Sequence, residues 1–432
     1  MNPATDRPQP RASARIPELD GLRGIAILFV LLWHYLGVFA HAPHRSLLAL
    51  GLCTVRLAWS GVDLFFVLSG FLIGGILIDA RKSADYFATF YRRRFFRIAP
   101  LYAAVCAVFW IGVRLGGASW RGAAGHWLFA DPLPWYAFPL FIQNFFMAGR
   151  GTFDPLSMGV TWSLAVEEQF YLTLPLLVRF LRPRTLVRVL LIVVVASPVL
   201  RAAAFYGLPH GGVAAYVLTP MRADGLVAGV LGAVLLRSPE GRALLVRRRR
   251  ALEITACALA ASTLGFVLLG ATDNTSALMS TVGYSWLAAL YGSVLVLAVS
   301  GPSSRLSALL RTRWLRWVGE IAYGTYLLHV AVLGACFALV FGREPHIRDR
   351  VELGVALLAA ALTFVLARLS WTLFERPLMR MGASRPERQL VRRGAGRRHL
   401  HAPVLDPVGE VLRVERDARE APRAPRIEPR QA

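Results

Sequence analysis

The chain has 432 residues, of which 56% are hydrophobic and 17% charged, and its mean hydropathy is +0.49. Its apolar residues gather in long runs, which water-soluble proteins rarely contain. Several of these runs are long enough, or nearly so, to cross a hydrocarbon core as helices. The composition excludes a soluble enzyme, an all-β sandwich and a disordered protein, and it indicates a polytopic membrane protein.

The formal net charge of +23 would, taken alone, suggest a nucleic-acid partner. However, 48 of the 49 basic residues are arginines, and most lie in short loops between apolar runs, where the positive-inside rule expects them. We therefore expect contacts with membrane lipids and no nucleic acid. The four cysteines show no paired spacing, so no metal site and no disulfide framework are expected.

Eleven apolar runs follow one another along the chain. They cover residues 24–42, 57–78, 98–116, 134–147, 161–181, 186–206, 214–236, 251–270, 281–299, 318–341 and 351–374. If all eleven crossed the bilayer, two arginine-rich loops would lie outside the cell, which the positive-inside rule disfavours. The run 134–147 is short, begins at a proline and carries Gln143 and Asn144, so we expect it to be non-spanning or re-entrant. The sequence thus predicts an all-α bundle of about ten transmembrane helices, with both termini on the cytoplasmic side of the inner (plasma) membrane.

The spans define three parts of the chain. Residues 1–15 are polar, proline-rich and basic, and we expect a flexible arm. Residues 16–377 form the transmembrane domain. Residues 378–432 contain 13 arginines, 7 acidic residues and six prolines but no apolar run, so we expect a largely disordered cytoplasmic tail near anionic lipid.

Ionisable side chains inside a bilayer are costly and usually mark a pathway or a reaction site. Arg23 and His34 are 11 residues, or about three helical turns, apart and therefore share one face of the first span. Arg23 would lie at the cytoplasmic mouth and His34 near or beyond the midplane. A snorkelling arginine and a packed histidine explain this pair equally well.

Two further pairs stand out. Arg94 and Arg97 are three residues apart and lie on one side of a helix, where their planar guanidinium groups would suit phosphates. Positive-inside anchoring alone would also explain this basic cluster. Glu167 and Glu168 are adjacent within an apolar run and point about 100° apart, so at most one of them faces a given cavity.

Other polar residues within apolar runs are secondary candidates for the site. They are Asp63, Ser69, Arg222, Asp224, Tyr326 and His329. For His329, a core contact with Tyr326 one turn earlier is favoured over catalysis. Arginines thus gather at the cytoplasmic mouth, while histidine, glutamate and aspartate gather deeper, as expected for an anionic donor held from inside and a proton-accepting site beyond it.

Seven motifs in chain order resemble those of the acyltransferase-3 family. They are LDGLRGIAILFVLLWHY, FFVLSGFLIGGIL, RFFR with Pro100 and Tyr102, TWSLAVEEQFYLTLP, MRADGLVAGVL, GEIAYGTYLLH and FERP. They run from about Ile16 to Pro377. Members of this family are membrane proteins that O-acylate surface or secreted carbohydrates and related molecules. Some carry an additional hydrolase-like domain outside the cytoplasm. This chain resembles the stand-alone type.

The resemblance implies roles for five residues. His34 and Glu167 would be catalytic, with Glu167 orienting or charging the imidazole, and Arg23, Arg94 and Arg97 would bind the donor, acyl-CoA and most often acetyl-CoA. No metal is implied. The acceptor would be a hydroxyl of a carbohydrate, a glycolipid or a secreted metabolite. A glycolipid or polysaccharide transporter or flippase is the main alternative, since intramembrane charges also line transport paths.

Overall fold

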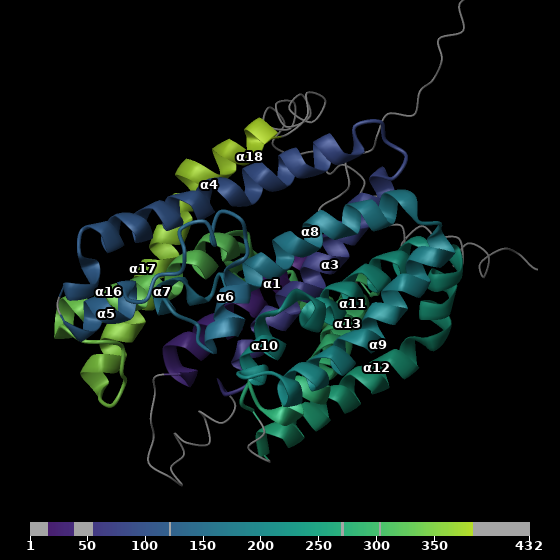
Figure 1. Cartoon of the computed structure of the whole chain (residues 1–432). Helices are drawn as coiled ribbons and strands as arrows, with labels where there is room; N and C mark the ends of the chain where they lie inside the picture. Colours follow the sequence, from purple (N-terminus) through teal and green to yellow (C-terminus); the bar gives the residue numbers. More distant parts are fainter. Residues whose placement is uncertain (1–15, 39–54, 121, 269–271, 302–303, 383–432) are drawn as a thin grey trace, which may run out of the picture. The chain divides into compact units, whose positions relative to one another are not determined.

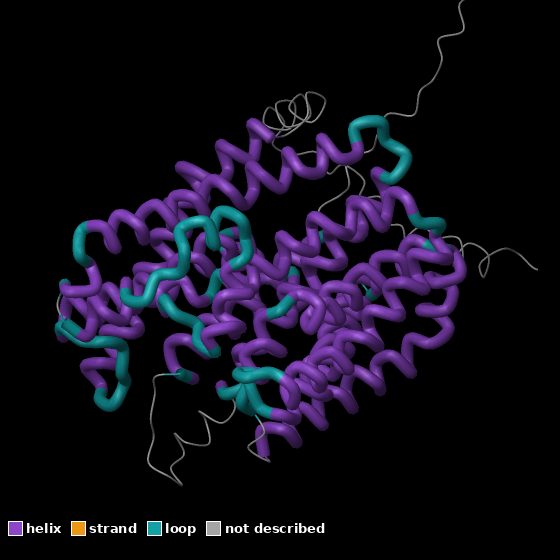
Figure 2. Tube along the Cα trace, viewed as in Figure 1, coloured by secondary structure: helices purple, strands orange, loops and turns teal. Residues whose placement is uncertain are grey.

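A computed structural model describes residues 16–38, 55–120, 122–268, 272–301 and 304–382. In these ranges the chain is helical, and Figure 2 shows loops but no strand between the helices. The helices belong to one compact unit, Pro17–Ser384. The prediction of an all-α fold is confirmed. The expected N-terminal arm and the expected tail from residue 383 onward lie outside the described residues.

The longer helices follow the apolar runs of the sequence (Figure 1). They are α1 (Pro17–Leu32), α3 (Gly61–Ala80), α4 (Tyr86–Arg114), α8 (Trp162–Phe180), α9 (Pro183–Gly207), α11 (Thr219–Arg237), α12 (Pro239–Leu268), α13 (Tyr284–Ser300), α16 (Ala322–Phe341) and α17 (Arg350–Ser370). Shorter helices connect or extend them. They are α5 (Ala123–Phe129), α6 (Gln143–Arg150), α7 (Leu156–Gly159), α10 (Gly211–Val217), α14 (Arg305–Leu310), α15 (Arg313–Glu320) and α18 (Arg376–Gly382). Five short turns of 3₁₀ or π geometry complete the set. They are η1 (Trp33–Gly37), η2 (Ala58–Ser60), η3 (Gly117–Ser119), η4 (Met279–Gly283) and η5 (Trp371–Glu375).

Nine helical segments of the described chain are long and apolar enough to cross a membrane. They are Pro17–Gly37, Ala58–Ala80, Tyr86–Arg114, Pro183–Gly207, Gly211–Arg237, Pro239–Val267, Met279–Ser300, Ala322–Phe341 and Arg350–Gly382. Helix α8 has a comparable length of 19 residues, but Glu167, Glu168 and Arg179 interrupt its apolar sequence. These nine segments and α8 correspond one to one with the ten predicted spans. The polytopic helical membrane fold is confirmed.

The segment 134–147 forms no spanning helix, in agreement with the sequence prediction. It consists of turns followed by α6, and its two amides are fully buried. The Gln143 amide donates to the Thr161 carbonyl at 2.8 Å, and the Asn144 amide donates to the Val217 carbonyl at 3.1 Å. These polar side chains therefore tie the segment to the beginning of α8 and the end of α10.

Helices α3 and α11 pack against each other more extensively than any other pair of described elements. Glycines stand where the two backbones meet, because a Cβ at Gly70 would collide with the Leu226 carbonyl and a Cβ at Gly229 with the Val67 carbonyl. Small residues at a helix interface allow this close approach, which gives packing energy where lipid supplies no hydrophobic driving force.

Helix α1 is held in the same way by the LDGLRG motif. A Cβ at Gly24 would collide with the Leu315 carbonyl, and a Cβ at Gly319 would collide with the Asp20 carbonyl. Helix α1 also packs against α3 and α16. Arg23 in this helix and His34 in the turn η1 that directly follows it are consequently placed by three neighbouring elements.

The close crossing of α3 and α11 can be tested by adding one methyl group. Gly70→Ala should lower the thermal unfolding midpoint of the detergent-purified protein, because overpacking a tight contact costs about 1–3 kcal/mol. Gly354→Ala in α17 is the matched control, since a Cβ there meets nothing within 4 Å. Equal midpoints for the two variants would contradict the crossing.

Candidate active site

A cavity in the described bundle brings together four of the five residues predicted for catalysis and donor binding, and also the secondary candidates Ser69 and Tyr326. Arg23 reaches it from α1, Arg94 and Arg97 from α4, and Glu167 from α8. It contains about 780 Å³ of empty space, its open mouth included. The other residues that line it are Val62, Phe65, Phe66, Ser69, Ile98, Ser163, Leu164, Tyr171, Gly319, Ala322, Tyr323 and Tyr326.

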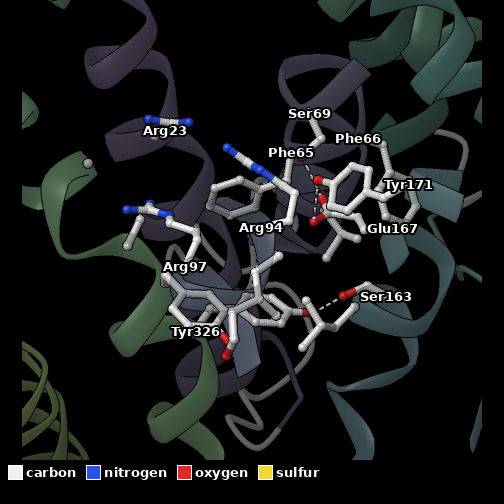
Figure 3. A pocket seen from close by; sticks show the side chains of 16 residues that line it. Arg23, Phe65, Phe66, Ser69, Arg94, Arg97, Ser163, Glu167, Tyr171 and Tyr326 are labelled. Atoms are coloured by element: carbon white, nitrogen blue, oxygen red, sulfur yellow. Dashed lines mark hydrogen bonds between the residues drawn. The ribbon is translucent and has the colours of Figure 1, made fainter. Parts of the chain in front are cut away.

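The three guanidinium groups lie on one side of this cavity (Figure 3). Arg23 is 3.5 Å from the Asp20 carboxylate, and the Arg97 guanidinium lies 5.7 Å from the centre of the Trp371 ring. Arg94 has no hydrogen bond or ion pair to any described residue. Like charges that share a small space repel each other unless an anion joins them. The arrangement therefore suits a ligand with several negative charges.

In the view of Figure 3, Glu167 lies beyond Arg94, on the side away from Arg23 and Arg97. Its Oε1 accepts a hydrogen bond from the Ser69 hydroxyl at 2.7 Å, and its Oε2 accepts one from the Tyr171 hydroxyl at 3.1 Å. Glu168 is not among the residues that line the cavity, and its buried Oε1 has no hydrogen-bond partner within the described part of the chain. Of the adjacent glutamates, one thus faces the cavity and the other does not, as helical geometry requires.

His34 lies in the π turn η1, directly after α1. Its Nδ1 is 2.9 Å from the Val30 carbonyl oxygen and 3.2 Å from Nε2 of His329 on α16. The two rings meet edge to face, with centroids 4.7 Å apart. Isolated π turns are frequent at functional sites. His329, for which the sequence favoured a core contact, is fully buried and lies directly against His34.

The arginine cavity and the histidine pair adjoin through α16. The side chain of Tyr326 lines the cavity, and its hydroxyl lies 2.6 Å from the Ser163 hydroxyl. The backbone carbonyl of the same tyrosine is 2.7 Å from Nδ1 of His329. His34 itself does not line the cavity, and both oxygens of Glu167 contact other groups. A direct interaction between Glu167 and His34 stays a prediction.

Three secondary candidates form buried ion pairs rather than lining the cavity. Arg222 lies 2.7 Å from Asp63, and Arg201 lies 2.9 Å from Asp224. The Arg222 guanidinium also lies over the Tyr284 ring at 3.8 Å, a cation–π geometry. These pairs connect α3, α9 and α11. Each charge has an opposite charge within the bundle, although Oδ2 of Asp63 and Nη1 of Arg222 have no hydrogen-bond partner in the described part of the chain, and this pairing indicates a structural role.

Sequence reasoning did not single out several residues of the site. Tyr171 follows Glu167 by four residues, a spacing that places two side chains together on a helix and could have suggested the contact. Tyr323 precedes Tyr326 by three residues and lines the same cavity. The buried Arg201 could have been noticed as an intramembrane charge, but no local pattern points to its partner on another helix.

Comparison with known proteins relates the chain to acyltransferases. The model of a family described as an acyltransferase domain matches residues 16–373. A peptidoglycan O-acetyltransferase of Listeria monocytogenes is 29% identical over 377 residues, which are 85% of this chain and 56% of that protein. An O-acetyltransferase of Staphylococcus aureus is 24% identical over 384 residues, 85% of this chain and 58% of that protein. The chain thus spans little more than half the length of these curated relatives. No solved structure matches the chain.

The structural role of the buried pairs leads to a prediction with an internal control. Two Asp–Arg pairs join α3 to α11, both at a distance of 2.7 Å. The Asp63–Arg222 pair is buried, whereas the Asp79 side chain of the Asp79–Arg237 pair is 57% exposed. Asp63→Asn should destabilise the protein by about 3–5 kcal/mol, because it leaves a buried charge unpaired. Asp79→Asn should cost no more than about 1 kcal/mol.

Unfolding curves of both variants in detergent would measure the difference in stability. Equal losses would show that Arg222 does not depend on Asp63.

Proposed function

Because the chain belongs to the acyltransferase-3 family, we propose that it is a membrane O-acyltransferase that moves an acetyl group from acetyl-CoA to a hydroxyl of a carbohydrate or related acceptor. The observation that carries the proposal is the convergence of Arg23, Arg94 and Arg97 on one cavity, with the His34–His329 pair one turn of α16 away from the cavity wall.

The donor's phosphates bind to the guanidinium groups. A guanidinium presents several N–H donors in a plane that matches phosphate oxygens, and such charge-assisted hydrogen bonds are stronger than neutral ones. Arg94 has all of its donors available for this purpose within the described structure. Apolar side chains such as Phe65 and Ile98 line the same cavity and suit the uncharged pantetheine arm, which carries the thioester toward His34.

The transfer needs a base for the acceptor. The His34 imidazole takes the proton from the acceptor hydroxyl while its oxygen attacks the thioester carbonyl. A new C–O bond forms, the C–S bond breaks, and the thiolate of CoA takes the proton from the imidazolium. A route in which the imidazole first carries the acetyl group uses the same residue and the same leaving group.

The relatives guide the choice of acceptor, and the cavity and the basic loops guide the choice of membrane side. Because the Listeria monocytogenes relative is named for peptidoglycan, a peptidoglycan sugar is the first acceptor to try, with glycolipids and secreted metabolites as alternatives. The lining of one cavity by Arg23, Arg94 and Arg97 supports a single side of the membrane for all three. The basic loops favour the cytoplasm for this side, with both termini there in the plasma membrane.

Turnover of a thioester distinguishes an acyltransferase from a transporter. The purified protein in liposomes would receive acetyl-CoA and muropeptide fragments, and released CoA thiol and acetylated fragments would be measured. We expect both products. Mass spectrometry of surface glycans and lipids from cells with and without the protein would reveal any other acceptor by a mass difference of one acetyl group. Absence of thiol release and of any acetylated species would overturn the proposal.

The donor site predicts a binding defect in Arg94→Ala. Loss of a hydrogen bond to a charged group costs about 1.5–3 kcal/mol, so KM for acetyl-CoA should rise about ten- to hundredfold. Arg92→Ala is the matched control, since Arg92 is exposed on the same helix and does not line the cavity. An unchanged KM in Arg94→Ala would remove this arginine from the donor site.

The catalytic role predicts a different defect in His34→Ala. Its kcat should fall about 10²- to 10⁴-fold, the usual contribution of a positioned acid or base, while membrane insertion and acetyl-CoA binding persist. His126→Ala, which alters an exposed histidine on α5, should behave as wild type. A His34→Ala protein with more than about a tenth of normal turnover would exclude His34 as the base.

A further inference from the structure

We propose that His329 is a positioning residue that holds the proton of His34 on Nδ1 and thereby leaves Nε2 of His34 as the nitrogen that takes the acceptor's proton. The inference rests on the proposed function, because it concerns the same imidazole. It adds a second histidine to the site and names the reacting atom of the first.

The proton positions follow from two backbone carbonyls. Nδ1 of His34 is 2.9 Å from the Val30 carbonyl oxygen, and Nδ1 of His329 is 2.7 Å from the Tyr326 carbonyl oxygen. A carbonyl oxygen can only accept a hydrogen bond. Each Nδ1 must therefore carry the proton and donate it.

The hydrogen bond between the two rings therefore runs in one direction, from His34 to His329. In a neutral imidazole one nitrogen donates and the other accepts, so the Nε2 of His329 carries a lone pair. Nε2 of His329 is 3.2 Å from Nδ1 of His34. The proton on Nδ1 of His34 is thus shared between this lone pair and the Val30 carbonyl. A proton on Nε2 of His329 would instead point at another N–H group. The His34 ring thus keeps its own lone pair on Nε2.

The backbone around His329 is held by the residue next to His34. The Tyr35 hydroxyl donates to the His329 carbonyl at 3.0 Å and lies 3.0 Å from the Thr363 hydroxyl on α17. The turn η1 therefore contacts His329 through two consecutive residues, one at its ring and one at its carbonyl. Since His329 is fully buried, its ring has little freedom to turn away from His34.

This arrangement supports a positive charge on His34 without a carboxylate. When Nε2 takes a proton, the Nδ1–H group keeps both of its acceptors, the Val30 carbonyl and the lone pair of His329. Hydrogen bonds from a charged donor are stronger than those from a neutral one, so the pair favours the protonated intermediate. The oxygens of Glu167 are meanwhile occupied by Ser69 and Tyr171.

Three variants test the role of His329 in the full-length protein in liposomes. His329→Leu removes the acceptor and should lower kcat about ten- to hundredfold, while KM for acetyl-CoA stays within about twofold. His329→Gln, whose amide oxygen reaches nearly as far as Nε2, should recover most of this loss. His329→Asn, whose oxygen is too short to reach His34, should not. Similar turnover in all three variants, or a loss confined to KM, would overturn the role of His329.

The tautomer can be observed without any turnover. In protein labelled with ¹⁵N-histidine in bilayers, the NMR signals lost in His34→Ala should be those of a neutral ring protonated on Nδ1, at a pH where histidine is uncharged. Signals of a ring protonated on Nε2 would overturn the inference while leaving the proposed function intact. Absence of acetyl-CoA turnover in the wild-type protein would instead overturn the proposed function.

Discussion

A charged group inside a membrane bundle has to find an opposite charge or a polar partner, since neither lipid nor packed side chains can solvate it. Two buried arginines satisfy this requirement internally, Arg222 with Asp63 and Arg201 with Asp224. Arg94 differs, because it faces a cavity and has no hydrogen bond or ion pair to the described residues. The contrast separates the charges that stabilise the bundle from those available to a ligand, and it supports the proposed donor site by an argument that uses no relative.

The sequence predicted the helices well because long apolar runs directly reflect burial in lipid. It also identified Gln143 and Asn144 as unfavourable for a span, and the structure buries both amides in contacts with neighbouring helices. It could not predict which helices pack side by side, because such contacts depend on residues far apart in the chain. The pairing of His34 with His329 is of this kind, since the two lie 295 positions apart in the chain. The π turn at His34 also has no recognisable sequence signal.

The glycines of the LDGLRG motif explain why the site occurs at this place in the bundle. Gly24 lets α1 approach α15 closely, and Gly319 on α15 allows the same approach from the other side. Arg23 is adjacent to this contact, and α1 continues from it to His34. One helical segment thus contributes to both parts of the site, a guanidinium to the cavity and an imidazole to the histidine pair. A change in the tilt of α1 would displace the two together.

Helix α16 completes the connection between binding and chemistry. The Tyr326 side chain forms part of the cavity wall, while its carbonyl lies 2.7 Å from Nδ1 of His329, the ring that we propose positions His34. In the proposed mechanism, a donor molecule in contact with Tyr326 would act on the helix that sets the proton arrangement of His34. Since the Tyr326 hydroxyl is also held by the Ser163 hydroxyl and the Val160 carbonyl, α8 and the segment before it resist that displacement. In the proposed mechanism these contacts would keep the Tyr326 carbonyl against His329 while a donor fills the cavity.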